Sequence, residues 1–370
     1  MGRGVPFMSW QEIPRAQLAA WNQRLLREPT ASIRQYPLLN EGHRLSGHIW
    51  INFVKPYSRL IEWCRRQTTT TRYLAYRSGG DLTSYAVVVG IGMPGLRLGC
   101  IVDGPVTFAG RQMEPREFSE LLNWARRNHY LAIRVTHPDP EYVDYLATLG
   151  EVERTDGVPF YPHPFSELFV DLSPDDEAVL ASFQTVARRN IRQAREAGYH
   201  VSIDRKAGAL ERAWSVFEAR SAQKQLNYRS LKMWKLIMNE AEPYHAAHVY
   251  TAWRNAVPIA SILVLRDHTT AHNLIGAIDR NALGDAPSPA CLLHWSAMQH
   301  AKRLGCRYYN LGTRSGSVYT FKAKFRPVER HWPLPATFII RPSLYHPWRR
   351  MLPTVTRFIM RQQNATGPAA

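Results

Sequence analysis

Hydrophobic and polar positions divide the first part of the chain into a helical start and a set of short strands. Apolar Ile13, Leu18, Trp21 and Leu25 recur at roughly helical spacing, which predicts an amphipathic helix from Trp10 to Arg27. Runs rich in β-branched and aromatic residues, separated by Gly-Gly-Asp and Met-Pro-Gly turns, predict strands. The predicted strands are Tyr73 to Tyr76, Ser84 to Ile91, Leu98 to Val102 and, after a helix from Glu114 to His129, Tyr130 to Thr136.

A second pattern of helices and strands begins after a segment rich in proline. Residues 153–164 hold Gly157 and three prolines, which predicts a linker. The residues Ser173-Pro174-Asp175-Asp176 then have the polar cap, the proline and the acidic side chains with which helices begin. The other predicted elements are helices at 210–224, 230–241 and 291–304, and strands at 168–172, 248–253, 258–266, 272–279 and 308–311.

The two halves of the chain resemble each other in the order of their elements. A helix ending at 124–127 precedes the strand at 132–135, and a helix ending at 300–303 precedes the strand at 308–311. This predicts duplication of one mixed α/β unit. A chain of 370 residues is long enough for two cores. We therefore expect an N-terminal domain at 8–160, a C-terminal domain at 166–345, a basic tail at 346–370 and, because heptads are missing, no coiled-coil arm.

Composition places the protein among ordinary globular proteins, with 45% hydrophobic and 21% charged residues. The four cysteines, at positions 64, 100, 291 and 306, form no CxxC pair and have no histidine at metal-ligand spacing. We therefore expect neither a disulfide framework nor a metal site. The N-terminus resembles no signal peptide and no apolar run is long enough to span a bilayer, so a cytoplasmic location is expected.

The net charge of +17 is concentrated in two segments. Residues 186–235 contain twelve basic and four acidic side chains, and residues 299–361 contain thirteen basic and one acidic. Such clustering suits a polyphosphate partner, which could be a nucleic acid, a nucleotide-linked substrate or an anionic membrane surface. The alternative is that the charge serves solubility alone.

The clearest candidate site follows the strand at 308–311. Asn310-Leu311-Gly312-Thr313 places a polar side chain and a flexible backbone at the carboxyl end of a strand, where α/β sheets bind ligands. A short loop then leads to Tyr319 and to the run Phe321-Lys322-Ala323-Lys324-Phe325. Lys322 could meet a ligand there. Taken alone, a lysine between phenylalanines is more typical of a surface residue whose stem packs on apolar neighbours.

Four motifs in residues 165–330 resemble the Fem family of non-ribosomal aminoacyltransferases. The first is Gly305 to Gly312 with Tyr319 and the Phe321 to Phe325 run. The second is the helix that begins Ala290-Cys291-Leu292-Leu293-His294-Trp295. The third is the helix of residues 185–194, which contains Arg188-Arg189-Asn190, and the fourth is Asn227-Tyr228-Arg229 with Met233 and Trp234. The N-terminal half matches only through the turn at 104–106.

The resemblance implies two tandem GNAT-like domains of α/β (α+β) class, which transfer an amino acid from aminoacyl-tRNA to an acceptor amine. It implies that Lys322, beside Phe321, stabilises the oxyanion and that Arg229 holds the pyrophosphate of a nucleotide-linked acceptor. The acceptor would be a peptidoglycan precursor, a lipid-linked peptide or a small peptide or metabolite, and no cofactor or metal is implied. Further substrate-binding residues would be Tyr228, Trp234, Asn310, Gly312, Thr313 and Tyr319; Arg188, Arg189, Arg192 and Lys324 would contact tRNA.

The residues themselves support part of this assignment. Arg188, Arg192 and Arg195 fall at i, i+4 and i+7, so one helix face could follow a nucleic-acid backbone or could simply be solvated. The basic tail, with Trp348, Leu352, Val355 and Ile359 at helical spacing, could contact tRNA, anionic lipid or the domain itself, and packing is favoured.

Two other functions compete with aminoacyl transfer. An acyl-CoA-dependent GNAT N-acyltransferase would need a pyrophosphate loop, but residues 280–287 place glycine one position late and add Asp285. A nucleic-acid-binding protein without catalysis would explain the charge and leave the motifs unexplained. The family's tyrosines are missing from the strand that begins at His272, and its paired aromatics are missing at Met233 and Trp234, so the acceptor is expected to differ.

Overall fold

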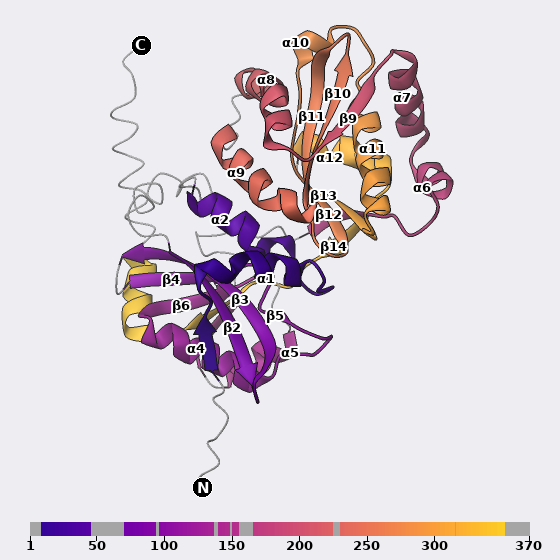
Figure 1. Cartoon of the computed structure of the whole chain (residues 1–370). Coiled ribbons are helices and arrows are strands. Elements are labelled where there is room, and N and C mark those ends of the chain that lie inside the picture. The colour runs from indigo at the N-terminus through magenta and orange to yellow at the C-terminus, as the bar shows by residue number, and fades with distance from the viewer. Residues whose placement is uncertain are drawn as a thin grey trace, which may run out of the picture.

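The computed structural model describes residues 9–45, 70–93, 96–136, 140–148, 150–154, 166–224, 230–314 and 316–351. In these ranges the chain forms two mixed α/β lobes, one below the other in Figure 1. This confirms the predicted fold class. The strands of the first sheet are β1 (Ser9–Glu12), β2 (Thr70–Ser78), β3 (Asp81–Met93), β4 (Leu96–Ile101), β5 (Val106–Thr107), β6 (Tyr130–Val135), β7 (Val152–Arg154) and β15 (Ala336–Ile339).

Helices cover both faces of the first sheet. Phe118, Leu121 and Trp124 of α4 pack on one face, and Trp21 and Leu25 of α1 pack on the other. The apolar positions of α4 recur every three to four residues, which explains why this segment is helical and which side it buries. The helices before and within this lobe are η1 (Arg15–Gln17), α1 (Leu18–Leu25), η2 (Ile33–Gln35), α2 (Pro37–Leu45), α4 (Pro115–Arg127) and α5 (Pro140–Ala147).

The second sheet has the same construction. Its strands are β8 (Ser166–Asp171), β9 (His200–Asp204), β10 (Ala247–Arg254), β11 (Val257–Arg266), β12 (Thr270–Ile278), β13 (Tyr308–Thr313) and β14 (Val328–His331). One face is covered by α7 and α11, and the other by α8 and α9. The helices are α6 (Asp176–Ser182), α7 (Thr185–Glu196), α8 (Ala207–Lys224), α9 (Leu231–Ala241), η4 (Glu242–Tyr244), α10 (Arg280–Leu283), α11 (Ala290–Arg303), α12 (Gly316–Lys322) and η5 (Ala323–Phe325).

The strand order shows how the duplication suggested by the sequence is realised. In the first sheet β4 and β6 pair in parallel and are connected through α4, and in the second β12 and β13 pair in parallel and are connected through α11. The orders β1-β2-β3-β4-β6-β15-β7 and β9-β10-β11-β12-β13-β8-β14 therefore correspond position by position.

This correspondence reveals that the two lobes exchange equivalent strands. The place beside β6 is filled by β15 from the C-terminal part of the chain, and the place beside β13 is filled by β8, which follows the first lobe in sequence. The predicted C-terminal domain of 166–345 therefore does not coincide with one sheet, because residues 336–339 belong to the first. Each sheet can be completed only by the other half of the chain, which couples the two lobes.

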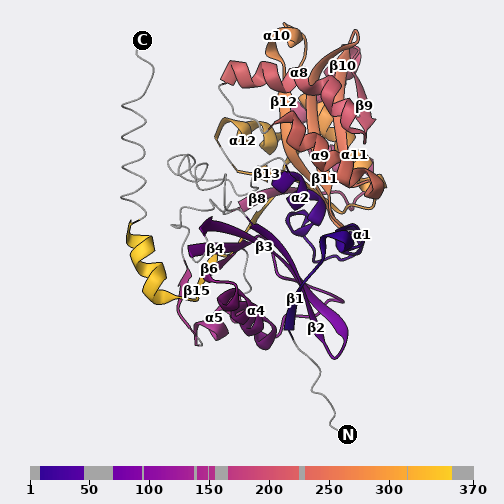
Figure 2. The same ribbon diagram turned by 60° about the vertical axis from the view of Figure 1, so that its left-hand side comes forward.

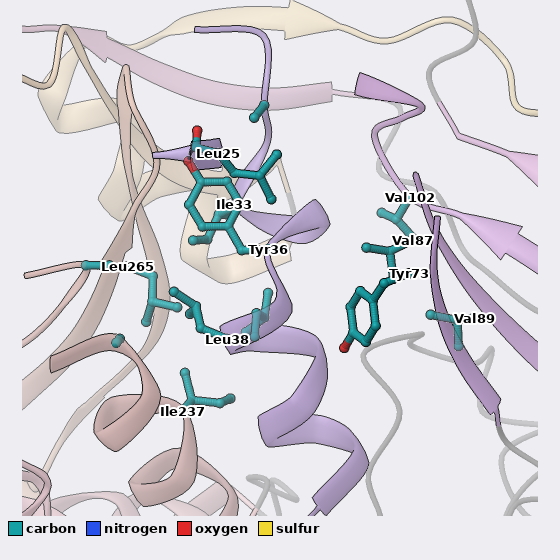
Figure 3. Close-up of a cluster of buried hydrophobic side chains, with 14 of the residues drawn as sticks. Leu25, Ile33, Tyr36, Leu38, Tyr73, Val87, Val89, Val102, Ile237 and Leu265 are labelled. Carbon is teal, nitrogen blue, oxygen red and sulfur yellow. Dashed lines mark hydrogen bonds between the residues drawn. The ribbon is translucent and has the colours of Figure 1, made fainter. Parts of the chain in front are cut away.

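A single hydrophobic cluster runs through the junction between the lobes. Figure 3 shows Leu38 of α2 facing Ile237 of α9 and Leu265 of β11, with Tyr73 and Val87 of the first sheet on the other side of the helix. All five side chains are at most 3% exposed. Since burying one such side chain contributes about 1.5–3 kcal/mol, α2 fixes one lobe against the other.

The structure differs from the sequence-based prediction at the N-terminal helix and shows part of the predicted C-terminal tail. The helix predicted from Trp10 to Arg27 is wrong at its start, because residues 9–12 form β1 and pair with β2, and α1 begins only at Leu18. The predicted linker of 153–164 lies largely outside the described residues. Residues 342–351 form a helix, drawn yellow in Figure 2, and its Tyr345 packs against the first lobe. The rest of the predicted tail lies outside the described ranges.

Candidate active site at the end of strand β13

Lys322 lies on the last turn of α12 and points back to the end of β13. Its Nζ atom donates a hydrogen bond of 2.7 Å to the carbonyl oxygen of Thr313, and only 9% of the residue is exposed. Gly312 has φ +79°, and a Cβ atom there would lie 3.6 Å from Nζ. The strand end and the lysine therefore form one unit, in which glycine is needed for the positive φ, whereas a Cβ atom would make only an ordinary contact with Nζ.

A bulge in the pairing of β13 with β8 shapes this strand end. The register shifts between Asn310 and Thr313, so the ladder is interrupted where the backbone turns toward α12. The side chain of Asn310, which is 2% exposed, stabilises the bulge by accepting a 2.6 Å hydrogen bond from the Gly312 amide at Oδ1. The amide of Asn310 donates to Glu167 Oε2 over 3.2 Å and to His272 Nδ1 over 3.3 Å.

Glu167 belongs to β8 and connects this strand end to the first lobe. Its Oε1 atom receives a hydrogen bond of 2.7 Å from Arg34 of η2, whose other terminal nitrogen lies 2.8 Å from Asp103 Oδ2. Burial by itself raises the pKa of the Glu167 carboxyl, but the charge of Arg34, together with that of His272 when its ring is protonated, outweighs burial and leaves that pKa below its usual value. Glu167 is therefore a buried carboxylate at neutral pH.

Burial is also the main influence on Lys322. It lowers the pKa of the ammonium group to about 8, and the negative charge of Glu167 limits the drop. At neutral pH most of the side chain remains protonated. A desolvated ammonium group with a pKa near the working pH can stabilise a negative charge that develops in a transition state.

The wall behind Lys322 is aromatic. Phe321 packs 5.4 Å from the ring of Phe325 and 5.4 Å from that of His294, which is itself hydrogen-bonded to the Tyr309 hydroxyl over 3.0 Å. Burial, with a contribution from the Lys322 charge, lowers the pKa of His294 to about 3. His294 is therefore neutral and structural, and it supports the helix that carries Lys322.

The predicted tRNA-binding side chains divide into two groups. Arg189 and Arg192 are exposed on α7, and Arg192 lies 3.7 Å from Glu196 in a solvent-exposed pair. Arg188 instead turns back toward the end of α6, where it donates to the carbonyl oxygens of Ala181 and Phe183. Arg188 is thus only partly exposed and is already hydrogen-bonded to carbonyl groups at the end of α6, unlike Arg189 and Arg192; its expected contact with tRNA stays a prediction.

Lys324 lies close to this helix, because η5 contacts the start of α7. The Gln184 amide donates to the Lys324 carbonyl over 2.9 Å, and the Gln184 side chain donates to the Ala323 carbonyl over 3.0 Å. The Lys324 ammonium lies 5.9 Å from the centre of the Phe321 ring. The basic helix α7 and the segment that carries Lys322 are thus neighbours.

The other predicted substrate-binding residues have different surroundings. The guanidinium of Arg314 lies over the ring of Tyr319, with its central carbon 4.6 Å from the ring centre. Trp234 is 2% exposed and belongs to the cluster on the α8 and α9 face, whereas Phe321 and Tyr319 pack against the cluster on the opposite face. The structure therefore does not bring Trp234 together with them. Tyr228 and Arg229 lie outside the described residues.

A cavity of about 680 Å³ lies at the junction of the two lobes; Glu167 and His272, which contact Asn310, line it, whereas Lys322 and residues 310–313 do not. Arg34 and Asp103 line it from the first lobe, and Glu167, His272 and Arg330 line it from the second. Arg330 lies 4.0 Å from the ring centre of Tyr308 and 4.5 Å from that of Phe169. A volume of this size is typical of a small-molecule pocket.

Sequence reasoning missed the charged groups of this junction. Arg34, Asp103 and Glu167 are separated by up to 133 positions and match no local motif. The available signal was Glu167 within the apolar strand Ser166–Asp171, and an acidic residue in a strand is more typical of a solvated position. In the described part of the chain, no three His, Cys, Asp or Glu side chains converge as metal ligands do, and no helix has the length and hydropathy needed to cross a bilayer.

The fold defines a protein of two tandem GNAT-like units. The acetyltransferase (GNAT) domain family matches residues 181–323, which include β9 to β13 and Lys322. Among solved structures, FemX superposes with a TM-score of 0.71 at 13% identity, over 92% of this chain and 99% of FemX. The Fem-like tandem arrangement expected from the motifs is thus confirmed as a fold.

Two further solved structures share this arrangement. A conserved protein of unknown function from Bacteroides thetaiotaomicron VPI-5482 gives a TM-score of 0.57 at 8% identity, over 90% of this chain and all of that one (100%). The C-terminal domain of a protein described as a putative lysylphosphatidylglycerol synthetase from Agrobacterium fabrum gives a TM-score of 0.52 at 13% identity. The superposition covers 88% of this chain and 92% of that domain. No curated protein matches the chain. The superposed structures show the fold, and the match to the acetyltransferase domain family supports an acyltransferase in general terms.

Proposed function

We propose that the protein transfers an amino acid from aminoacyl-tRNA to the amine of an acceptor. The observation that carries this proposal is the largely buried ammonium group of Lys322, held at the bulged end of β13. The same residues carry the resemblance to Fem aminoacyltransferases. A fixed cation in a desolvated site is suited to an acyl transfer, because such a reaction develops negative charge on one carbonyl oxygen.

The reaction requires no covalent enzyme intermediate. The deprotonated acceptor amine attacks the ester carbonyl carbon, a C–N bond forms, and Lys322 donates a hydrogen bond to the resulting oxyanion. The intermediate collapses with cleavage of the ester C–O bond. The ribose hydroxyl of the tRNA leaves with the proton released by the amine, so atoms and charge balance without another reactant.

The surface beside the lysine supports tRNA as the donor. Exposed Arg189 and Arg192 on α7 and the neighbouring Lys324 on η5 place positive charge next to the segment that carries Lys322. Basic side chains in such a row contact phosphates, and each contact makes binding depend on salt. Acceptors of the kind expected from the sequence are a peptidoglycan precursor, a lipid-linked peptide or a small peptide, and contact with an anionic membrane is part of the same proposal.

Acyl-CoA is the competing donor, and the match to the acetyltransferase domain family favours it. The connection between β12 and α11, however, is already occupied by its own residues. Asp279 accepts hydrogen bonds from the amides of Asn281 and Ala282 at 2.9 and 3.2 Å, and Asp285 adds a second carboxylate to the loop. A pyrophosphate needs free amides and positive charge at this position, so the loop argues against acyl-CoA.

The proposal is tested by incubating the purified protein with aminoacyl-tRNA carrying a mixture of labelled amino acids, and in parallel with acetyl-CoA. Acceptors are offered as a panel of nucleotide-linked precursors and short peptides, and products are identified by mass spectrometry. We expect an aminoacyl product from charged tRNA. An acetylated product, with no product from aminoacyl-tRNA, would replace this proposal by the acyl-CoA alternative.

A further inference from the structure

The charged groups at the lobe junction form a continuous chain that ends at the candidate catalytic strand. Asp103 and Arg34 come from the first lobe, and Glu167, Asn310 and Gly312 from the second. The distances are 2.8 Å from Asp103 to Arg34 and 2.7 Å from Arg34 to Glu167. They are 3.2 Å from Glu167 to the Asn310 amide nitrogen and 2.6 Å from the Asn310 oxygen to the Gly312 nitrogen. Lys322 binds the carbonyl of Thr313, the residue after Gly312. We propose that Glu167 is a positioning residue for Lys322, and that Arg34 extends this control across the lobe junction.

The geometry of the Asn310 amide shows why a carboxylate is needed. Its nitrogen has two acceptors, Glu167 Oε2 and the Nδ1 atom of His272. In the neutral form of His272, the Nε2–H donates to Asp267 over 2.7 Å and the Nδ1 atom accepts from Asn310. The amide can therefore place only its oxygen toward the Gly312 N–H. A glutamine at position 167 could present its own N–H₂ and allow the Asn310 amide to flip.

Charge is the second link between Glu167 and Lys322. The pair lies in a largely buried region, where Glu167 favours the protonated lysine and burial opposes it. Arg34 neutralises part of the charge of Glu167, and its own side chain is only 13% exposed. Two substitutions should therefore act in opposite directions on the protonation of Lys322. Loss of the Glu167 charge disfavours the ammonium form. Loss of the Arg34 charge favours it at the alkaline pH where Glu167 stays ionised, because Arg34 no longer opposes the charge of Glu167.

Other charged groups around the lysine are accounted for. His294 faces Lys322 from α11 and stays neutral, since its pKa is about 3. Asp103 faces Arg34 and Ser32, and Asp267 faces His272 and the Ile33 amide. Glu167 is the carboxylate whose charge reaches Lys322 most directly.

This inference rests on the proposed function for its catalytic meaning, but its test does not need a substrate. Competitive acetylation with acetic anhydride measures the titration of individual lysines, with mass spectrometry of each lysine-containing peptide. It is applied to the full chain, to Glu167→Gln and to Arg34→Met, from pH 6.5 to 10.5. Exposed Lys206 serves as the internal reference because its surroundings are unchanged. Circular dichroism and thermal unfolding establish that each variant is folded.

We expect the titration midpoint of Lys322 to fall by about one pH unit in Glu167→Gln and to rise in Arg34→Met. Lys206 should keep its midpoint in both. An unchanged or raised midpoint of Lys322 in Glu167→Gln, or an unchanged midpoint in Arg34→Met, would overturn the proposal, because the charge of Glu167 and its control by Arg34 must then be without effect on the lysine. If one variant does not fold, the sign of the shift in the other decides. An inactive protein in the aminoacyl-transfer assay would count against the proposed function and leave this titration result standing.

Discussion

The ammonium nitrogen of Lys322 lies 2.7 Å from the carbonyl oxygen of Thr313, so the side chain of a helix caps the end of the strand that precedes it. A lysine in this position is already desolvated and oriented before any substrate binds. The Thr313 carbonyl takes one of the three N–H donors of the ammonium group, so the others can bind the carbonyl oxygen of an incoming ester. Preorganisation of this kind is what makes a single cation effective in acyl transfer.

Replacement of Lys322 by alanine should therefore reduce turnover strongly. We expect kcat to fall by about two to three orders of magnitude, with little change in the affinity for tRNA. Single-turnover rates and tRNA binding are measured separately on the same preparation. Lys206→Ala, on an exposed surface, is the matched control and should keep full activity. Full activity in Lys322→Ala would remove this lysine from the mechanism.

The pH dependence of the reaction should reflect the lysine as well as the acceptor. Lys322 is protonated below its pKa of about 8, so kcat/KM should decline as pH rises through that value. Lys322→Arg keeps its charge throughout, and whatever activity it retains should lack this alkaline decline. Initial rates are corrected for spontaneous ester hydrolysis at each pH. An identical alkaline decline in the arginine variant would assign the titration to another group.

His294 should make stability depend on pH. Its pKa is about 3 in the folded protein and 6.5 in its unperturbed state, so the unfolded chain binds the additional proton between these values. Stability should consequently fall as pH decreases from 6.5, by at most about 1.4 kcal/mol per pH unit for this group. Urea unfolding of His294→Gln at pH 7 and pH 5 should show a smaller loss. Some pH dependence of stability should remain in this variant, because the buried His248 also has a pKa of about 3. His346→Gln, at a half-exposed site, is the control and should lose as much stability as the wild type.

Salt dependence should separate the two kinds of arginine on α7. The double variant Arg189→Ala with Arg192→Ala is expected to weaken tRNA binding and to reduce the slope of log K against log salt by about two. Arg188→Ala should leave that slope unchanged and lower stability by about 1 kcal/mol, because it removes hydrogen bonds to the end of α6. Arg72→Ala with Arg77→Ala on the first sheet is the charge-matched control. Equal effects of both double variants on binding would point to net charge rather than to α7.

The exchange of strands predicts that the C-terminal part of the chain stabilises the N-terminal lobe. Phe338 of β15 is 2% exposed and packs edge-on against Phe118 of α4 at 4.7 Å. Phe338→Ala should lower the free energy of unfolding by about 3–5 kcal/mol. Leu334→Ala, at a half-exposed position nearby, is the control and should lower it only slightly. Hydrogen exchange in β6 and β7 reports the site of the loss. Protection that is lost only in the second sheet would contradict this assignment.

Elements formed by neighbouring residues were predictable. The bounds of β10 and β11 lie within a residue or two of the strands predicted at 248–253 and 258–266. Such a pair is predictable because alternating apolar residues and a short turn define an antiparallel hairpin from neighbouring residues. The α11 helix and the strand after it were also predictable from consecutive residues, and both contain motifs on which the resemblance to the Fem family rests. Trp10 shows the limit. Helical spacing was present, but pairing with residues 74–77 of β2 placed this segment in a sheet.

The sequence by itself determined the two α/β units, the basic segments and the run of residues that ends in Lys322. These depend on local periodicity, charge and motif spacing, which are written in consecutive residues. Only the tertiary structure decided that β8 and β15 change places and that Arg34 pairs with Glu167. Arg34 and Glu167 are 133 positions apart, and the strands that pair with β8 and β15 are similarly remote in sequence, so these contacts depend on the packing of whole sheets. The physical reason is that a buried charge is tolerated only beside its partner, and the partner is known only once the chain has folded.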